Sequence, residues 1–339
     1  MLGRVDQDEF QKWSRRCQRR ALVENHMMQT RRDMLRFGVA AGVGALCQST
    51  RAADKDEADP MIDCHTHFYD PSRPQGVPWP GKDDKSLYRT VLPADYRKQG
   101  DALGVTGTVI VEASSWVEDN QWIFDIAEND PFVLGLVGNL EPGTPEFARN
   151  FARFAKNRLF LGIRVNSAPL GDGLKSPAYF GDLKRLATAG LELDVNGGPE
   201  LLPIVDQLAK ELPELRIAVN HLANLRIDGK TPPKTWLDGM AAAAKHPQVY
   251  CKVSALVEGA VPQPPATDVD YYKPVLDHAW KTFGDDRVVY GSDWPVSERC
   301  ASLDVVQGLM TDYLSNRPQA VRRKFFHDNA LAVYQWLPR

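Results

Sequence analysis

The sequence predicts an α/β fold, a single (β/α)₈ barrel of the TIM type that follows an N-terminal export signal. Three observations support this prediction. The chain has 339 residues, of which 43% are hydrophobic and 25% charged, as in an ordinary globular protein. From residue 61 onward, eight short apolar runs alternate with segments of helical periodicity, and several of these runs end in polar side chains. Repeated strand–helix units predict a parallel sheet, and eight parallel strands are the number that closes a barrel.

Residues 1–53 differ from the rest of the chain in charge. They contain ten Lys and Arg residues against five Asp and Glu residues, which leaves 31 against 39 in the remainder. A nucleic-acid-binding domain usually carries a basic surface. The acidic remainder therefore gives no reason to expect a nucleic-acid partner.

The basic segment is similar to a twin-arginine export signal. Arg31 and Arg32 precede a weakly apolar run, Phe37–Cys47, which small residues follow. This run of about 11 residues suits a signal peptide and is well short of the roughly 20 needed to cross a bilayer, and no other segment predicts a stable membrane span. We therefore expect residues 1–53 to be a leader, disordered or cleaved, that the export translocon recognises, and the protein to be periplasmic or exported. A basic tail is the alternative.

Residues 54–339 are predicted to form the barrel. The predicted strands are short runs of apolar or β-branched residues. They are Met61–His67, Thr108–Ala113, Val133–Asn139, Phe160–Val165, Leu191–Val195, Arg216–His221, Val249–Ser254 and Val288–Asp293. The predicted helices have an apolar period of 3.6 residues. They are Pro93–Leu103, Gln121–Glu128, Glu146–Ala155, Tyr179–Ala189, Pro199–Glu211, Trp236–His246, Tyr272–Phe283 and Ala320–Tyr334.

The longest connections, Phe68–Thr90 and Ala255–Asp270, are rich in proline, and both follow predicted strands. Loops that follow the strands of such a barrel lie at its C-terminal face, where active sites are built. We therefore expect the site among these loops and the strand ends beside them.

Two histidines end the first predicted strand. His65 and His67 are two residues apart, so in a strand they project to the same side, while Cys64 and Thr66 face the helices. Both imidazoles then reach one metal ion or one substrate oxygen. The alternative is two structural histidines, which would leave two polar rings inside a barrel. We interpret the pair as catalytic residues and candidate metal ligands.

The last predicted strand ends in Asp293, which closure of the barrel brings beside the first strand. A carboxylate in this position binds a metal ion, accepts a proton from water, or does both in turn. The alternative is a turn aspartate before Pro295. The residue between them, Trp294, is a candidate substrate contact.

Four more predicted strands end in polar side chains. Glu112 is either a metal ligand or the partner of a cation. Arg164 and Lys252 suit an anionic or hydroxyl-rich substrate, and each is alternatively half of a structural ion pair. His221 is the only other histidine that ends a predicted strand, and we expect it in the catalytic site rather than in the core.

Taken together, these motifs resemble those of the amidohydrolase superfamily, family 2. The similar segments are Asp63–His67 and Gly291–Pro295 and, for a narrower branch, Gly162–Arg164, Asn220–His221, Cys251–Ser254 and Phe283–Arg287. That branch of predicted metal-dependent hydrolases contains sugar lactonases and 2-pyrone-4,6-dicarboxylate lactonase. The resemblance runs from about residue 61 to residue 337. It implies a barrel in which the paired histidines lie on the first strand and the aspartate of the eighth strand activates the hydrolytic water.

The resemblance also limits the metal content. Members with two metals carry a bridging lysine or glutamate on strand four and histidines on strands five and six, whereas here strand four has Arg164 and strand five has Asp194 and Asn196. We therefore do not expect a two-metal centre. One divalent ion, with Zn²⁺ as the first choice, and a metal-free site both stay open, because the pyrone-dicarboxylate lactonases are regarded as metal-independent. The candidate ligands are His65, His67, Asp293 and Glu112.

The leading hypothesis is a hydrolase that opens a small cyclic ester, such as a sugar lactone or a pyrone-carboxylate-like lactone. Asp293 would activate water, and His65 and His67 would polarise the carbonyl. The other polar strand-end residues would orient the substrate. Two alternatives remain. A metal-dependent non-oxidative decarboxylase would, by resemblance, have a histidine on strand five, which this sequence does not offer. A non-catalytic sugar-acid-binding protein of the same fold would have no need of an intact Asp293.

Overall fold

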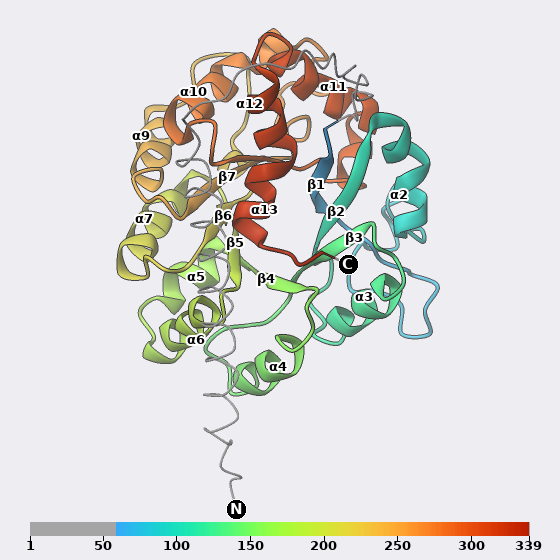
Figure 1. Cartoon of the computed structure of the whole chain (residues 1–339), viewed down its shortest axis with the longest axis vertical. Coiled ribbons are helices and arrows are strands. Elements are labelled where there is room, and N and C mark those ends of the chain that lie inside the picture. Colours follow the sequence, from blue (N-terminus) through green and yellow to red (C-terminus); the bar gives the residue numbers. More distant parts are fainter. Residues whose placement is uncertain (1–58, 339) are drawn as a thin grey trace, which may run out of the picture. The chain divides into compact units, whose positions relative to one another are not determined.

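Eight parallel strands, each hydrogen-bonded to the next along the chain, form the sheet of the computed structural model, which describes residues 59–338. The strands are β1 Met61–Thr66, β2 Val105–Val111, β3 Val133–Gly138, β4 Phe160–Asn166, β5 Glu192–Asn196, β6 Ile217–Val219, β7 Val249–Val253 and β8 Val288–Tyr290. Figure 1 shows them curving around a central axis with helices outside. The predicted (β/α)₈ barrel of the TIM type is confirmed.

The barrel closes between the first and eighth strands just beyond the end of β8. The backbone N–H of Asp293 donates to the carbonyl of His65 (2.9 Å), and that of His67 donates to the carbonyl of Trp294 (2.8 Å). A parallel bridge joins Thr66 to Trp294 in the same place. The residues that close the barrel are therefore the residues of the predicted site and their neighbours.

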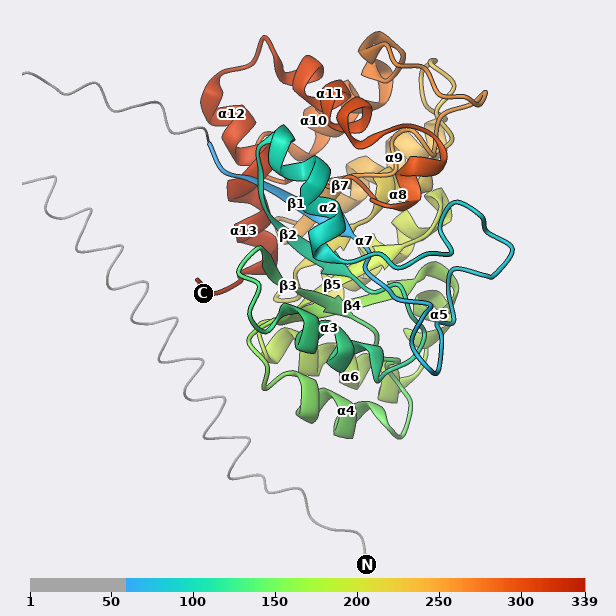
Figure 2. The same ribbon diagram turned by 90° about the vertical axis from the view of Figure 1, so that its right-hand side faces the viewer.

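Helices follow most of the strands and cover the outside of the sheet (Figures 1 and 2). They are α2 Pro93–Gly100, α3 Asp119–Ala127, α4 Phe147–Phe154, α5 Ser167–Gly173, α6 Pro177–Thr188, α7 Leu202–Glu211, α8 His221–Asn224, α9 Lys234–Ala243, α10 Lys273–Phe283, α11 Leu303–Leu314, α12 Gln319–Arg323 and α13 Asn329–Tyr334. Among them, α5, α8 and α11 were not predicted. The predicted helix Ala320–Tyr334 corresponds to α12 and α13, which a π-helical turn, Lys324–Asp328, joins.

Side chains from alternate positions of the strands fill the barrel. This inner cluster comprises Ile62, Cys64, Val109, Val111, Val137, Leu161, Ala218 and Val289, and Ala330, Val333 and Tyr334 of α13 complete it. Figure 2 shows α13 at the end of the barrel where the strands begin, opposite the long loops. Because α13 and this cluster close the end where the strands begin, the opposite end is the one that is open to a ligand.

The expected orientation of Cys64 toward the helices is wrong. Cys64 belongs to the inner cluster together with Ile62, two residues before it, and the pairing of β1 with β2 then shifts register between Asp63 and Thr66. Such a shift adds a residue on one strand and breaks the strict alternation of side chains. His65 and His67 nevertheless both reach the same centre, as described below.

The strand ends differ from the prediction by at most three residues. The observed β6 ends at Val219 and β8 at Tyr290, so His221 and Asp293 lie in the loops just beyond their strands. The predicted twin-arginine leader, residues 1–53, lies outside the described residues. Within residues 59–338, no helix is long and apolar enough to cross a membrane.

Candidate active site

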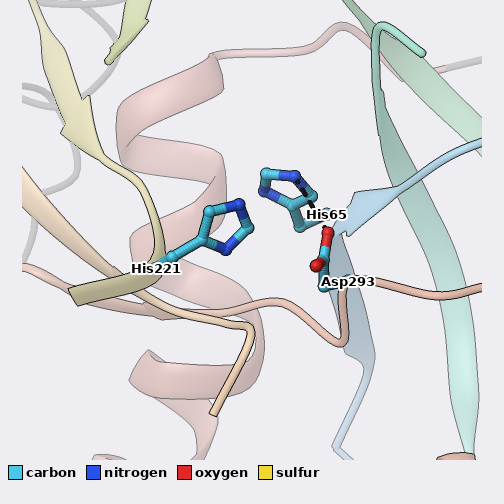
Figure 3. A group of neighbouring side chains, drawn as sticks. All are labelled: His65, His221 and Asp293. Carbon is cyan, nitrogen blue, oxygen red and sulfur yellow. Dashed lines mark ion pairs between the residues drawn. The ribbon is translucent and has the colours of Figure 1, made fainter. Parts of the chain in front are cut away.

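Three side chains from distant parts of the sequence converge at the C-terminal ends of the strands: His65 of β1, His221 after β6 and Asp293 after β8 (Figure 3). The Nε2 atom of His65 lies 3.5 Å from Oδ1 of Asp293. The ring of His221 lies 4.4 Å from the ring of His65, centroid to centroid. His67 reaches the same carboxylate, with Nε2 3.2 Å from Oδ1 of Asp293. The structure thus brings together the four predicted catalytic residues.

Backbone strain positions two of these side chains. Asp293 has a φ angle of 60°, and His221, Leu222, Ala223 and Asn224 have φ angles between 44° and 55°. This left-handed region costs an ordinary residue roughly 1–2 kcal/mol, and α8 is therefore a left-handed turn made entirely without glycine. Such strain persists only where the surroundings enforce it, and it is frequent at functional sites.

Ser254, which follows β7, holds His221. Its Oγ accepts a hydrogen bond from the backbone N–H of His221 (3.3 Å) and lies 2.8 Å from Nδ1 of the His221 ring. Burial lowers the pKa of His221 to about 4, although the charge of Asp293 opposes this change. The ring is therefore neutral at pH 7, with Nδ1 occupied and Nε2 available to the site.

His67 is oriented by its other ring nitrogen. Nδ1 donates to the backbone carbonyl of Val111 (2.9 Å), which can only accept. In the neutral ring, Nε2 then carries a lone pair directed at Oδ1 of Asp293. Two acceptors at 3.2 Å need a proton or a cation between them. The site therefore holds a shared proton or a positive charge at this point.

His65 is constrained by a buried lysine. Lys252, which the sequence places among the substrate-binding candidates, is fully buried, pairs with Asp194 (2.6 Å) and lies 3.4 Å from Nδ1 of His65. An ammonium group only donates, so a neutral His65 accepts at Nδ1 and carries its hydrogen on Nε2. Burial, followed by the charge of Lys252, lowers the pKa of His65 well below its usual value. Lys252 thus sets the tautomer of His65, and a direct contact with substrate stays a prediction.

The other predicted residues surround this centre. Arg164 donates from Nε to Oε1 of Glu112 (2.9 Å) and from Nη2 to the Glu112 carbonyl (2.8 Å). Glu112 is thus engaged by a cation, the alternative that the sequence left open. Trp294 is buried, and its indole N–H donates to Glu298 (2.7 Å). The roles of Arg164 and Trp294 in binding substrate stay predictions.

Asp63 supports the backbone of the site, a role that was not predicted from the sequence. Its Oδ1 accepts from the backbone N–H groups of His65 (3.0 Å) and Ser292 (2.9 Å), and its Oδ2 accepts from the hydroxyl of Tyr96 (2.8 Å). This carboxyl therefore fixes β1 against the segment that carries Asp293. A buried aspartate inside the Asp63–His67 motif was the signal that could have found it.

A pocket of about 380 Å³ opens beside His221, between the loop after β6 and the loop after β7. Glu258 lines it and interacts with the carboxyl of Asp293. Glu258 was not among the predicted residues, because it lies inside a long loop rather than at a strand end.

The centre fits one divalent cation. The ligand atoms of His65, His221 and Asp293 all lie within 4.8 Å of one another, and no hydrogen bond within residues 59–338 satisfies the buried Nε2 of His65. Two imidazoles, one carboxylate and a water complete a four-coordinate zinc site of the catalytic kind. A cation at His65 would require the tautomer opposite to the one that Lys252 favours, so hydrogen bonding and metal binding are alternatives for this atom.

Known proteins with similar sequences and folds include several hydrolases. A family model described as Amidohydrolase matches residues 62–336. An L-fucono-1,5-lactonase of Burkholderia ambifaria is 32% identical over 240 residues, which are 70% of this chain and 80% of that protein. The matched segment thus spans most of both proteins.

Two solved structures share the fold. An amidohydrolase from Burkholderia multivorans with bound zinc has a TM-score of 0.74 at 23% identity, with 82% of this chain and 99% of that chain covered. A putative 2-pyrone-4,6-dicarboxylic acid hydrolase from Pseudomonas putida has a TM-score of 0.64 at 19% identity, with 82% of this chain and 98% of that chain covered.

Proposed function

We propose a lactonase activity from the premise that this chain belongs to the amidohydrolase family, whose model matches residues 62–336. The chain is thus a hydrolase, and the proposal concerns its substrate, a cyclic ester of the sugar-lactone or pyrone-carboxylate kind. The observation that supports this proposal most strongly is that the Asp293 carboxylate faces Nε2 of both His65 and His67 in a buried site. The similarity to an L-fucono-1,5-lactonase supports the sugar lactone.

In this proposal Asp293 is the general base. Burial alone would raise the pKa of Asp293, but His221 and the contact with His67 outweigh burial, and the pKa lies below its usual value. The carboxylate takes a proton from water while the water oxygen bonds to the lactone carbonyl carbon. When the ring C–O bond of the tetrahedral intermediate breaks, Asp293 returns this proton to the leaving ring oxygen. The product is the open hydroxy acid.

The histidines would stabilise the negative charge that develops on the carbonyl oxygen. His65 directs its Nε2 side to the reaction centre in the tautomer that Lys252 favours, and such preorganised donors act strongly in a buried site. One zinc ion, if bound, would be held by His65, His221 and Asp293, and would supply Lewis-acid polarisation of the carbonyl.

The test is hydrolysis of L-fucono-1,5-lactone, other aldonolactones and 2-pyrone-4,6-dicarboxylate by the purified protein, with and without added Zn²⁺. Asp293→Asn should lower kcat by about 10²- to 10⁴-fold, because the amide keeps the shape and loses the proton acceptor. Metal analysis of the wild type should give at most one equivalent. A matched control is Asp238→Asn, which changes an exposed carboxylate on α9 that pairs with Lys234.

The outcomes discriminate between the alternatives. Undiminished turnover by Asp293→Asn would remove this residue from the mechanism. Tight binding of the lactones without turnover would favour a binding protein, and release of CO₂ from an aromatic acid would favour a decarboxylase. Two tightly bound zinc equivalents would contradict the single-ion site.

A further inference from the structure

Glu258 is a buried carboxyl group for which the described part of the chain provides no hydrogen-bonding partner other than the carboxyl of Asp293 and its own backbone N–H. The charge of Arg299 acts on it more weakly. Burial raises the pKa of Glu258 well above the usual value. Leaving a buried polar group unsatisfied is costly. Such a group indicates that a bound ligand supplies a hydrogen-bonding partner for the carboxyl.

The loop that carries Glu258 is fixed without any contribution from its side chain. The backbone N–H of Ile227 donates to the carbonyl of Gly259 (2.8 Å), and that of Val261 donates to the carbonyl of Ile227 (2.8 Å). A Cβ on Gly259 would lie 2.8 Å from the carbonyl oxygen of Leu225. The backbones of the two loops are therefore in close contact, and holding them together does not require the carboxyl of Glu258.

The pocket beside Glu258 suits a ligand with hydroxyl groups. Gln263 also lines it, but its amide already donates to the carbonyls of Val257 and Ala260 (3.0 Å each). A hydroxyl group both donates and accepts, so it pairs with either form of the Glu258 carboxyl. A carboxylate on the ligand would instead lie beside two other carboxyl groups, those of Asp293 and Glu258, which is unfavourable.

The cations near the site do not favour a dianionic ligand. Arg164 pairs with Glu112 and Lys252 pairs with Asp194, so both charges are balanced within the protein. Arg226, the cation that lines the pocket, is exposed, where water weakens its attraction for an anion.

We propose that Glu258 binds hydroxyl groups of the substrate ring, so that the enzyme accepts neutral polyhydroxy lactones and discriminates against lactones that carry carboxylates. This inference rests on the proposed function and specifies its substrate class. Glu258 binds hydroxyl groups rather than the reacting ester, so its loss should raise KM for the lactone. Because Glu258 also interacts with the carboxyl of Asp293, its substitution alters the surroundings of the general base as well, and the Kd of L-fucose is the measurement that isolates hydroxyl binding.

The experiment compares wild type, Glu258→Gln and Glu258→Ala with two probes. L-fucono-1,5-lactone reports on turnover. L-fucose has the same ring hydroxyls without the ester carbonyl, and calorimetry measures its binding independently of hydrolysis. Each substitution should raise KM for the lactone and Kd for L-fucose by about 10- to 100-fold, the range for a hydrogen bond to a charged or strongly polar group. The wild type should hydrolyse 2-pyrone-4,6-dicarboxylate with a much lower kcat/KM.

The control is Asp228→Asn, an exposed carboxylate on the loop after β6 that accepts from the backbone of Lys230. It should leave both constants unchanged. Circular dichroism and thermal unfolding establish that each variant is folded, and the Gln variant preserves the side-chain volume.

Three results would overturn the proposal. The wild type does not bind L-fucose, or both Glu258 variants bind it as tightly as the wild type does. The third result is a loss of kcat in the variants while KM and Kd stay unchanged. Loss of a bound zinc ion from Glu258→Gln would make Glu258 a metal ligand instead. The proposed function is tested separately. Binding of L-fucose that depends on Glu258 in a protein that hydrolyses no lactone would reject the activity and support the hydroxyl site. Lactone hydrolysis that neither Glu258 substitution changes would support the activity and reject the hydroxyl site.

Discussion

Asp63 is a single residue on which the geometry of the site depends. Its carboxyl accepts hydrogen bonds from three donors, two of which belong to the backbone of His65 and Ser292. Burial raises the pKa of Asp63, although these hydrogen bonds lower it in part. The protein thus accepts a buried carboxyl because that group aligns the two segments that carry the catalytic side chains.

We predict that Asp63→Ala lowers the free energy of unfolding by about 3–5 kcal/mol, because three buried donors lose their acceptor. Asp63→Asn should lose much less, since the amide oxygen still accepts from both backbone N–H groups and its NH₂ group can donate to Tyr96. Urea unfolding of both variants measures this. An equal loss in the two variants would mean that volume or charge, rather than the hydrogen bonds, determines the role of Asp63.

At the scale of elements, the left-handed turn α8 explains how His221 enters the site. The turn is held by contacts to three other elements: Ser254 bonds to His221, Trp236 donates to the carbonyl of Leu222 (2.7 Å), and Asn224 donates to Asn196 (3.0 Å). These bonds offset the strain of four residues with positive φ angles. A regular right-handed helix beginning at Asn220 would direct the imidazole elsewhere.

We predict that Ala223→Gly leaves the stability unchanged or raises it. Glycine relieves left-handed strain of about 1–2 kcal/mol and loses about 0.8 kcal/mol of methyl burial. The control is Ala209→Gly, an equally buried alanine in the right-handed helix α7. There glycine should lose about 2 kcal/mol, since helix propensity and methyl burial both decline. Comparable losses at the two positions, measured by urea unfolding, would show that Ala223 is not strained.

At the scale of the whole molecule, closure of the barrel and formation of the site are one event. The backbone of His65 and His67 pairs with that of Asp293 and Trp294, so residues about 230 positions apart in the sequence must meet before any catalytic geometry exists. The site therefore forms only when the sheet is complete.

Export concerns the whole chain as well, and we propose that the twin-arginine segment directs it. Replacing Arg31 and Arg32 with lysine should retain the protein in the cytoplasm, because the signal depends on the arginine pair rather than on positive charge. Fractionation of cells that produce the variant measures this. The control replaces Arg15 and Arg16 with lysine, an identical change in the same basic segment. Normal periplasmic accumulation of the Arg31/Arg32 variant would reject the signal.

Much of the fold could be predicted because its signals are local. Apolar runs and helical periods are properties of neighbouring residues, and they gave all eight strands to within three residues at each end. The unpredicted α11 follows the last strand, outside the strand–helix alternation that guided the prediction. The four catalytic candidates were found for a similar reason, since parallel strands in one barrel must bring their C-terminal ends together.

The sequence by itself thus determined the barrel, the face that holds the site and the residue types at its centre. Only the tertiary structure decided which groups pair. In the structure, Arg164 pairs with Glu112, and Lys252 pairs with Asp194. Cys64 lies inside the barrel, and His221 has a left-handed backbone conformation. Glu258 lies beside Asp293. The physical reason is that an ion pair, a register shift or a left-handed turn depends on atoms supplied by other strands and loops. No periodicity within one segment encodes these positions.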